Sequence, residues 1–170
     1  MMQVLKELLS THTAVGRVEW IGCSSATRAA IVSHNSVAVV KGGLQGDYHC
    51  RPKRSSKRQV TLIQAEHLPV VATLLGRESL APHELRRNLV VSGINLAALK
   101  YQQFRIGTAI LEGSGSCPPC SRMEENLGPG GYAAMLGHGG ITAIVIAEGI
   151  IQLGDSVQAL LNPEDSPSDS

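Results

Sequence analysis

The sequence predicts a mainly β fold with short helices, of the α+β class, in which an antiparallel sheet forms a barrel. Short apolar segments separated by glycine- and proline-bearing turns predict about six or seven strands and two or three short helices. Helical periodicity is absent over long stretches. Strands also do not alternate with helices as they do in a doubly wound parallel sheet. These observations favour a barrel-like β architecture with helices attached.

The first half of the chain carries a helix and three strands. Leucines at helical spacing predict a helix over residues 2–10. The segment VGRVEWIGCS (15–24) predicts a strand, and residues 37–40 predict a second that runs into a glycine-rich turn. A polar, basic loop at 49–58 precedes a strand at 59–64. In the first strand the alternation places Val18 and Trp20 on one face and Arg17, Glu19 and Ile21 on the other.

The second half begins with a helix over 65–76, which tolerates Pro69 in its first turn and ends at Gly76. Residues 88–96 predict a strand with a turn at Gly93. The segment FRIGTAILEG (104–113) alternates throughout and is interpreted as one strand. Residues 140–160 hold two apolar runs that a hairpin near Glu148 and Gly149 would join.

The chain has 170 residues, which predicts a single domain. We expect an N-terminal helix and lead-in over 1–14, the domain itself over 15–161, and a disordered polar tail over 162–170.

Composition argues against several partners. The net charge of +1 and the scarcity of aromatic rings, one Phe, one Trp and three Tyr, disfavour nucleic acid. No apolar run approaches the roughly 18 residues of a membrane helix, and the N-terminus lacks a signal-peptide pattern. We therefore expect a cytoplasmic protein without a membrane partner. Its four cysteines should be reduced, which favours catalytic or metal-binding roles over disulfides.

The segment SCPPCSRMEENLG (116–128) places Cys117 and Cys120 around a Pro-Pro pair. The pair can be interpreted as a redox couple, although the flanking thioredoxin pattern is missing. It can also be interpreted as half of a zinc site, although a second cysteine pair is missing. Either cysteine can also be a small buried residue. The remaining reading is one reactive thiolate at Cys120, with Arg122 close by to stabilise an anion.

Two other segments are candidates for binding an anion. In GLQGDYH (43–49), His49 and the basic run after it, which ends at Arg58, can face an anionic ligand or form a solvated loop. In ELRRNLVV, Arg86 and Arg87 offer planar guanidinium forks for phosphate, and Asn88 offers an amide for a heterocycle edge. The alternative is a helix end that carries arginines because they favour its dipole.

These motifs, followed by CPPCSRMEENLGPGGYAAMLGHGGI and GIIQLGDSV, occur in an order that resembles the MOSC domain, the module also found at the C-terminus of molybdenum cofactor sulfurases. The resemblance covers about residues 15–161 and implies a β-barrel-like MOSC fold. It implies that Cys120, preceded by Pro119, ligates molybdenum or carries a persulfide. In the larger relatives the metal ligand is the second cysteine of a Cys-x-x-Cys pair, and one alignment places that position at Met123. The expected cofactor-binding residues are Arg87, Asn88, Arg86, His49, Arg58, Cys117 and Arg122.

The resemblance implies a standalone protein that binds molybdenum cofactor (molybdopterin) and reduces N-hydroxylated compounds with electrons from a separate reductase. A second hypothesis is a sulfur carrier that receives persulfide sulfur at Cys120 from a cysteine desulfurase. A third is a non-catalytic binding module for an anionic metabolite. Pyridoxal phosphate belongs to relatives with an added desulfurase domain and is not expected here. The sequence leaves open whether the protein is an enzyme.

Overall fold

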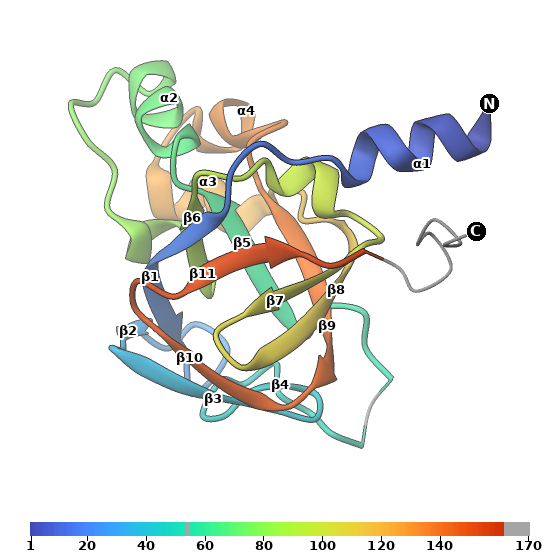
Figure 1. The fold of residues 1–170 in the computed structure, drawn as a ribbon. Helices are drawn as coiled ribbons and strands as arrows, with labels where there is room; N and C mark the ends of the chain where they lie inside the picture. Colours follow the sequence, from blue (N-terminus) through green and yellow to red (C-terminus); the bar gives the residue numbers. More distant parts are fainter. Residues whose placement is uncertain (54, 162–170) are drawn as a thin grey trace, which may run out of the picture.

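The computed structural model describes residues 1–53 and 55–161, and its centre is a closed barrel of seven strands (Figure 1). Around the barrel the order is β1, β6, β5, β9, β8, β7 and β11, and β11 pairs with β1 to close the ring. The β5–β6 pair is parallel, and the other barrel pairs are antiparallel, so the predicted fold class is confirmed. The strands are β1 Gly16–Cys23, β5 Val60–Gln64, β6 Leu89–Ser92, β7 Gln103–Ile106, β8 Ala109–Ser116, β9 Ile141–Ala147 and β11 Ser156–Ala159.

A smaller sheet lies at one end of the barrel (Figure 1). It consists of β10 Gly149–Gln152, β3 Ser36–Val40 and β4 Gly43–Leu44, while the short β2 Val32–Ser33 pairs antiparallel with the end of β1. The predicted hairpin near Glu148 and Gly149 is therefore wrong. Strand β9 pairs with β5 and β8 in the barrel, whereas β10 crosses to pair with β3.

Helices α2, α3 and α4 gather at the other end of the barrel (Figure 1). The helical elements are α1 Met2–Ser10, α2 His67–Leu74, α3 Ser121–Leu127, α4 Gly131–Met135 and the 3₁₀ helices η1 Pro82–Leu85 and η2 Leu96–Leu99. The helices predicted at 2–10 and 65–76 are confirmed, and Gly76 ends α2 with the left-handed φ of +67° that favours glycine.

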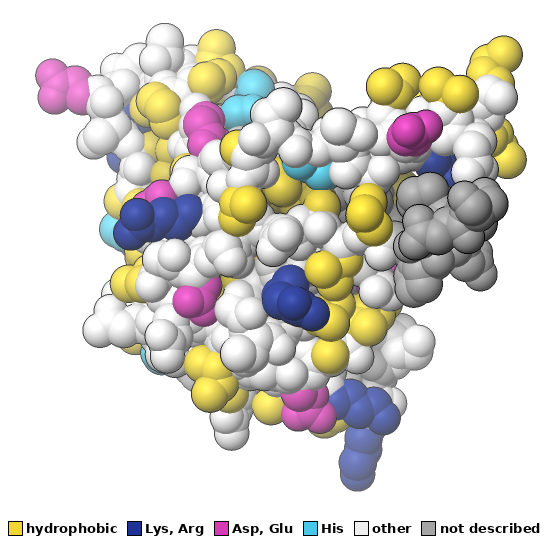
Figure 2. All heavy atoms as spheres, in the orientation of Figure 1, with side chains coloured by type: hydrophobic (Ala, Val, Ile, Leu, Met, Phe, Trp, Pro, Cys, Tyr) yellow, Lys and Arg dark blue, Asp and Glu magenta, His cyan; other side chains and the backbone are white. Residues whose placement is uncertain are grey.

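Helix α1 extends away from the barrel and carries exposed hydrophobic side chains along its length (Figures 1 and 2). In residues 1–53 and 55–161, no helix combines the length and apolar character needed to cross a bilayer. The predicted disordered tail, 162–170, lies outside the described residues. The division into a lead-in over 1–14 and a domain over 15–161 stays a prediction.

Two hydrophobic clusters form the core. The larger fills the barrel with aliphatic side chains and the fully buried Phe104. The smaller lies between the barrel wall and the helices, and includes Met123 and Leu127 of α3 and Met135 of α4. This second cluster fixes the position of the segment that carries the cysteine pair.

Two strand predictions need correction. A bulge between Val18 and Trp20 shifts the alternation of β1, so Ile21 is fully buried rather than facing outward with Arg17 and Glu19. The segment 104–113 forms the β7–β8 hairpin instead of one strand, because the chain turns at Gly107, which has φ +58°.

Candidate functional site

One pocket collects residues from segments that are distant in the sequence. Strand β1 is antiparallel to β6, and β6 is parallel to β5, so the end of β1 and the starts of β5 and β6 meet at one edge of the barrel. Helix α3 packs beside η1, directly before β6, and brings the cysteine segment to the same place. The predicted site residues that line this pocket are His49, Arg58, Arg86, Arg87, Asn88, Cys120 and Arg122.

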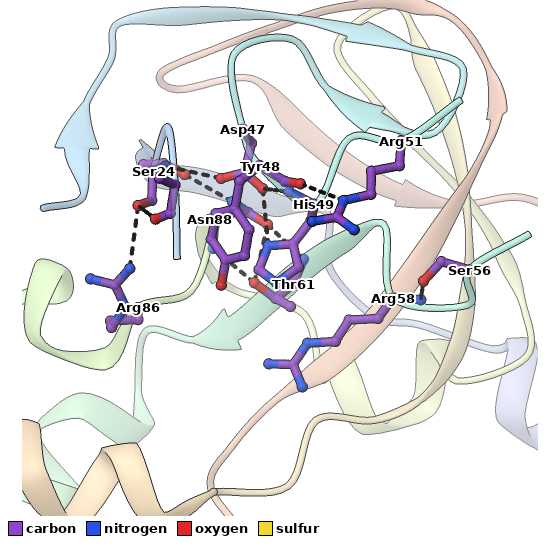
Figure 3. A network of polar contacts seen from close by, with 12 residues as sticks. Ser24, Asp47, Tyr48, His49, Arg51, Ser56, Arg58, Thr61, Arg86 and Asn88 are labelled. Carbon is purple, nitrogen blue, oxygen red and sulfur yellow. Dashed lines mark hydrogen bonds and ion pairs between the residues drawn. The ribbon is translucent and has the colours of Figure 1, made fainter. Parts of the chain in front are cut away.

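Asn88 lies at the buried base of the pocket and hydrogen-bonds to groups on two neighbouring strands (Figure 3). Its Oδ1 accepts hydrogen bonds from the Thr61 backbone N–H at 3.0 Å and the Thr61 hydroxyl at 3.1 Å. Its Nδ2 donates to the Gly22 carbonyl at 3.0 Å. The side chain therefore ties β6 to β5 and to β1, and three of the four hydrogen bonds that its amide can form are made within the protein.

Arg87 is 3% exposed and holds three loops together. Its Nε donates to the Gly139 carbonyl at 2.9 Å, Nη1 to the Leu85 carbonyl at 3.2 Å, and Nη2 to the Cys117 carbonyl at 3.4 Å. Burial lowers the pKa of Arg87, while the nearby Cys117 and Cys120 act in the opposite direction. We call Arg87 and Asn88 the floor of the pocket.

The loop that receives Arg87 needs glycine at position 139. A Cβ on Gly139 would overlap the Cys117 carbonyl oxygen. The backbone N–H of Cys117 in turn donates to the Gly140 carbonyl at 2.9 Å. Arg87 and Gly139 together therefore hold the segment that leads to Cys120 against the loop after α4.

Arg86 adopts a left-handed conformation, with φ +53°, that is uncommon for a residue with a side chain. Its Nη1 donates to the Ala29 carbonyl at 2.8 Å and its Nη2 to the Ser24 hydroxyl at 3.3 Å (Figure 3). These bonds hold the guanidinium beside the end of β1.

The upper part of the pocket is exposed, and we call Arg58, Cys120 and Arg122 its rim. Cys120 and Arg58 are exposed and Arg122 is half-buried. In Figure 3 the Arg58 side chain runs below the other residues of the network, and no dashed line reaches its guanidinium. Over residues 1–53 and 55–161, no carboxylate lies within 4.0 Å of the guanidinium of Arg58, Arg86, Arg87 or Arg122. The pocket thus carries positive charge that the described protein residues do not neutralise.

Cys117 and Met123 occupy different positions from Cys120. Cys117 is 1% exposed, does not line the pocket, and contacts Arg87 through its carbonyl. Met123 lines the pocket but is 2% exposed and packs in the smaller hydrophobic cluster.

All four cysteines are free thiols. Within the described part of the chain, no three His, Cys, Asp or Glu side chains converge as metal ligands, so a zinc site receives no support.

Sequence reasoning missed several pocket residues: Ser24, Ile31, Asp47, Tyr48 and Asn126 also line it. Asp47 is 6% exposed, and its Oδ2 lies 3.1 Å from His49 Nδ1, a contact that is an ion pair only when His49 is protonated. The sequence did carry a signal for Asp47, because Gly-Asp precedes His49 at close spacing, but the same dipeptide also forms ordinary turns.

A cationic pocket that contains an accessible thiol and a histidine suits an anionic ligand with an electrophilic or soft-metal centre.

Known structures share the architecture. The YuaD protein from Bacillus subtilis superposes with a TM-score of 0.74 at 21% identity, covering 84% of this chain and 94% of that one. YiiM from Geobacillus stearothermophilus gives 0.67 at 19% identity, covering 86% and 75%. YiiM from Escherichia coli gives 0.65 at 17% identity, covering 86% and 70%. These similarities concern the fold. A comparison with functionally curated proteins gives no match.

The family model of the MOSC domain matches residues 40–158, a span that contains every expected site residue and most of the barrel. The motif order, the barrel and this match agree. The chain belongs to the MOSC domain family.

Proposed function

We propose that the pocket binds the molybdenum cofactor, with Cys120 as the protein ligand to the metal and the arginines around its anionic part. One observation carries the proposal: an exposed thiol shares a pocket with four guanidinium groups that have no carboxylate within 4.0 Å among the described residues. Membership of the MOSC family supports it, because cofactor binding is associated with this domain.

The donor set fits such a ligand. The cofactor is a pterin dithiolene with a terminal phosphate, so it needs cations for the phosphate, amides for the pterin edge and a soft ligand for the metal. Arg58 and Arg122 have side chains that bond to no described residue and suit the phosphate. The thiolate of Cys120 is the soft ligand. Met123 packs in the hydrophobic cluster, so we assign metal ligation to Cys120 instead.

Asn88 needs a different role from the one expected of it. Both ends of its amide are bonded to Thr61 and Gly22, so it would shape the pocket and leave contact with the pterin to another group. Asn126 of α3 lines the same pocket and is exposed. We assign the amide contact to Asn126.

When bound, the cofactor supplies two-electron redox chemistry, which suits the reduction of N-hydroxylated compounds with electrons from a separate reductase. The chain's own part is to hold the anionic group and supply protons. The fixed positions of Arg86 and Arg87 serve the first of these tasks, because prearranged charges need no reorganisation on binding.

Metal and pterin analysis tests the proposal directly. The protein, purified from a host that makes the cofactor, should contain molybdenum and a fluorescent pterin near one equivalent each. Cys120→Ser should lose most of the molybdenum, and Arg58→Ala combined with Arg122→Ala should lose most of both. Arg105→Ala is the matched control, because Arg105 is an exposed arginine on β7 outside the pocket. A folded sample that contains neither component would refute the proposal.

The exposure of Cys120 also favours a second candidate, a sulfur carrier. Here a desulfurase persulfide would transfer its outer sulfur to the Cys120 thiolate, forming a new Cys120 persulfide and releasing the desulfurase thiol. Labelled sulfur should then appear on Cys120, in protein without pterin, and be absent from Cys120→Ser. Label on Cys120→Ser would exclude this role. Ligand binding that survives Cys120→Ser and fails without the arginines would instead indicate a module for an anionic metabolite.

A further inference from the structure

A buried carboxylate and a histidine form an oriented pair inside the pocket (Figure 3). Oδ1 of Asp47 accepts from the Ser24 backbone N–H at 3.0 Å. Oδ2 accepts from the His49 backbone N–H at 3.2 Å and lies 3.1 Å from His49 Nδ1. The Tyr48 backbone N–H donates back to the Ser24 carbonyl at 2.8 Å. The turn is therefore anchored to the end of β1 from both sides.

This geometry selects one form of the imidazole. Burial alone would raise the pKa of Asp47, but hydrogen bonds from His49 and from the Ser24 backbone, together with the charge of His49, hold it below its usual range. The carboxylate is then ionised at neutral pH and can only accept hydrogen bonds, so Nδ1 of His49 carries the proton that faces it. The Tyr48 ring, whose centroid is 4.0 Å from that of His49, further restricts rotation.

The other ring nitrogen is free for chemistry. Nε2 of His49 has no hydrogen-bond partner in residues 1–53 and 55–161, and the imidazole lines the pocket. Nε2 of His49 is also not among the buried side-chain atoms that lack a hydrogen-bond partner. In the described chain those atoms belong to His12 and Gln102. Nε2 is thus accessible to whatever occupies the pocket.

The arginines, Asp47 and Cys120 are poor proton donors in this pocket. The arginines that line it stay protonated at all working pH values and do not exchange a proton during turnover. Asp47 is held ionised beneath the histidine, and Cys120 is occupied if it ligates the metal. Histidine is the residue type best suited to give and take a proton near neutral pH.

We propose that His49 is the proton-transfer residue of this pocket and that Asp47 is its positioning residue. The proposal deepens the proposed function and takes its substrate class from it. Reduction of an N-hydroxylated compound breaks the N–O bond and takes up two electrons, from a reduced redox protein, and two protons. His49 Nε2 first takes a proton from solvent and, in the imidazolium form, gives it to the departing oxygen, which leaves as water. The nitrogen takes the second proton from solvent, and solvent also reprotonates His49.

The first arm of the test uses cofactor-free protein with ¹⁵N-labelled imidazoles. The His49 signal, identified by its loss in His49→Gln, should show the neutral ring protonated at Nδ1. Asp47→Asn should change this, because its amide can donate to Nδ1 and thereby place the proton on Nε2. A neutral ring protonated at Nε2 in the wild type, or one that Asp47→Asn leaves unchanged, would overturn the inference.

The second arm uses cofactor-loaded protein and an amidoxime probe with a chemically reduced electron donor. His49→Gln should keep its molybdenum and pterin content and its KM, while kcat falls about a hundredfold or more, the usual contribution of a general acid. The matched control is His34→Gln, since His34 is exposed and does not line the pocket. An unchanged kcat in His49→Gln contradicts the proton-transfer role, and a lost cofactor indicates a binding role instead.

The two arms separate this inference from the proposed function. If the wild-type protein contains no molybdenum and no pterin, the cofactor proposal fails, and the tautomer of His49 alone decides whether the pair is built as inferred. If the protein is loaded but His49→Gln is as active as the wild type, the cofactor proposal stands and this inference is wrong. If Asp47→Asn does not fold, His49→Gln still decides, because His49 is only partly buried.

Discussion

The floor and the rim of the pocket use arginine in opposite ways. Arg87 and Asn88 of the floor are both 3% exposed, and their polar atoms bond to backbone groups on neighbouring segments. Arg58 and Cys120 of the rim are exposed, and in the described chain their side-chain polar atoms have no bonded partner. The floor is therefore a structural brace that also carries charge, and the rim is the part available to a ligand.

Thiol reactivity gives the largest contrast between buried and exposed positions. Burial, with a smaller contribution from the charge of Asp47, raises the pKa of Cys23 to about 12. At pH 8 only about one Cys23 thiol in ten thousand is then the reactive thiolate. Iodoacetamide should label Cys120 at least about a hundredfold faster than Cys23, as measured by mass spectrometry of timed digests. Rapid labelling of Cys23 or Cys117 in folded protein would contradict the assignment of these thiols as buried.

Removing a floor residue should reduce stability most. Asn88→Ala leaves the buried Thr61 N–H and the Gly22 carbonyl without their partner, which should lower the free energy of unfolding by about 3 kcal/mol. Urea denaturation measures the change. Asn126→Ala is the matched control, because Asn126 is exposed, and it should change stability by less than about 0.5 kcal/mol. If the two variants were equally stable, Asn88 would contribute no more to stability than an exposed asparagine, which would contradict its role as a structural residue of the floor.

Removing a rim charge should affect binding and leave folding intact. Arg58→Ala and Arg122→Ala should each weaken pyrophosphate binding by roughly fivefold, about 1 kcal/mol, because each loses one cation in a solvated setting. Calorimetric titration at low salt measures this effect, which should shrink as salt is added. Arg105→Ala on β7 should bind as the wild type does. A rim variant that unfolds would show that the rim, too, is structural.

The smallest expected effect concerns the change in folding stability at acid pH. The pKa of Asp47 is lower in the folded protein than its ordinary value, so the carboxylate stabilises the fold above about pH 4. This contribution is lost as pH falls through the lower, folded-state pKa. Wild type should therefore exceed Asp47→Asn in stability at pH 7, and the difference should shrink below about pH 4. Parallel stability curves down to pH 2 would contradict the stabilisation of the Asp47 carboxylate in the folded protein.

The sequence identified the pocket residues better than it identified their roles. His49, Arg58, Arg86, Arg87, Asn88, Cys120 and Arg122 share one pocket. However, the division of these residues into floor and rim depends on which backbone carbonyls lie nearby, and those belong to segments 30 to 66 positions away. Residue type and local spacing carry no such information, so the sequence alone did not indicate that Asn88 bridges strands of the barrel.

The fold shows the same limit. Local patterns predicted the strands at 37–40 and 59–64 and the helix at 65–76, because each depends on its own residues. The β7–β8 turn was missed since a two-residue turn keeps the alternation in phase across Gly107. The partner of β10 was missed because pairing with β3, more than a hundred positions earlier, leaves no local trace.

The long-range bonds of Arg87 and Asn88 also have a consequence for folding kinetics. Asn88 reaches back 66 positions to Gly22, and Arg87 reaches forward 52 positions to Gly139. Contacts of such separation form slowly, because long loops must close before these contacts give any stabilisation. The binding pocket can therefore exist only after most of the chain has been synthesised and the barrel has closed. A ligand that needs this pocket would select finished molecules over partly folded ones and stabilise them by mass action.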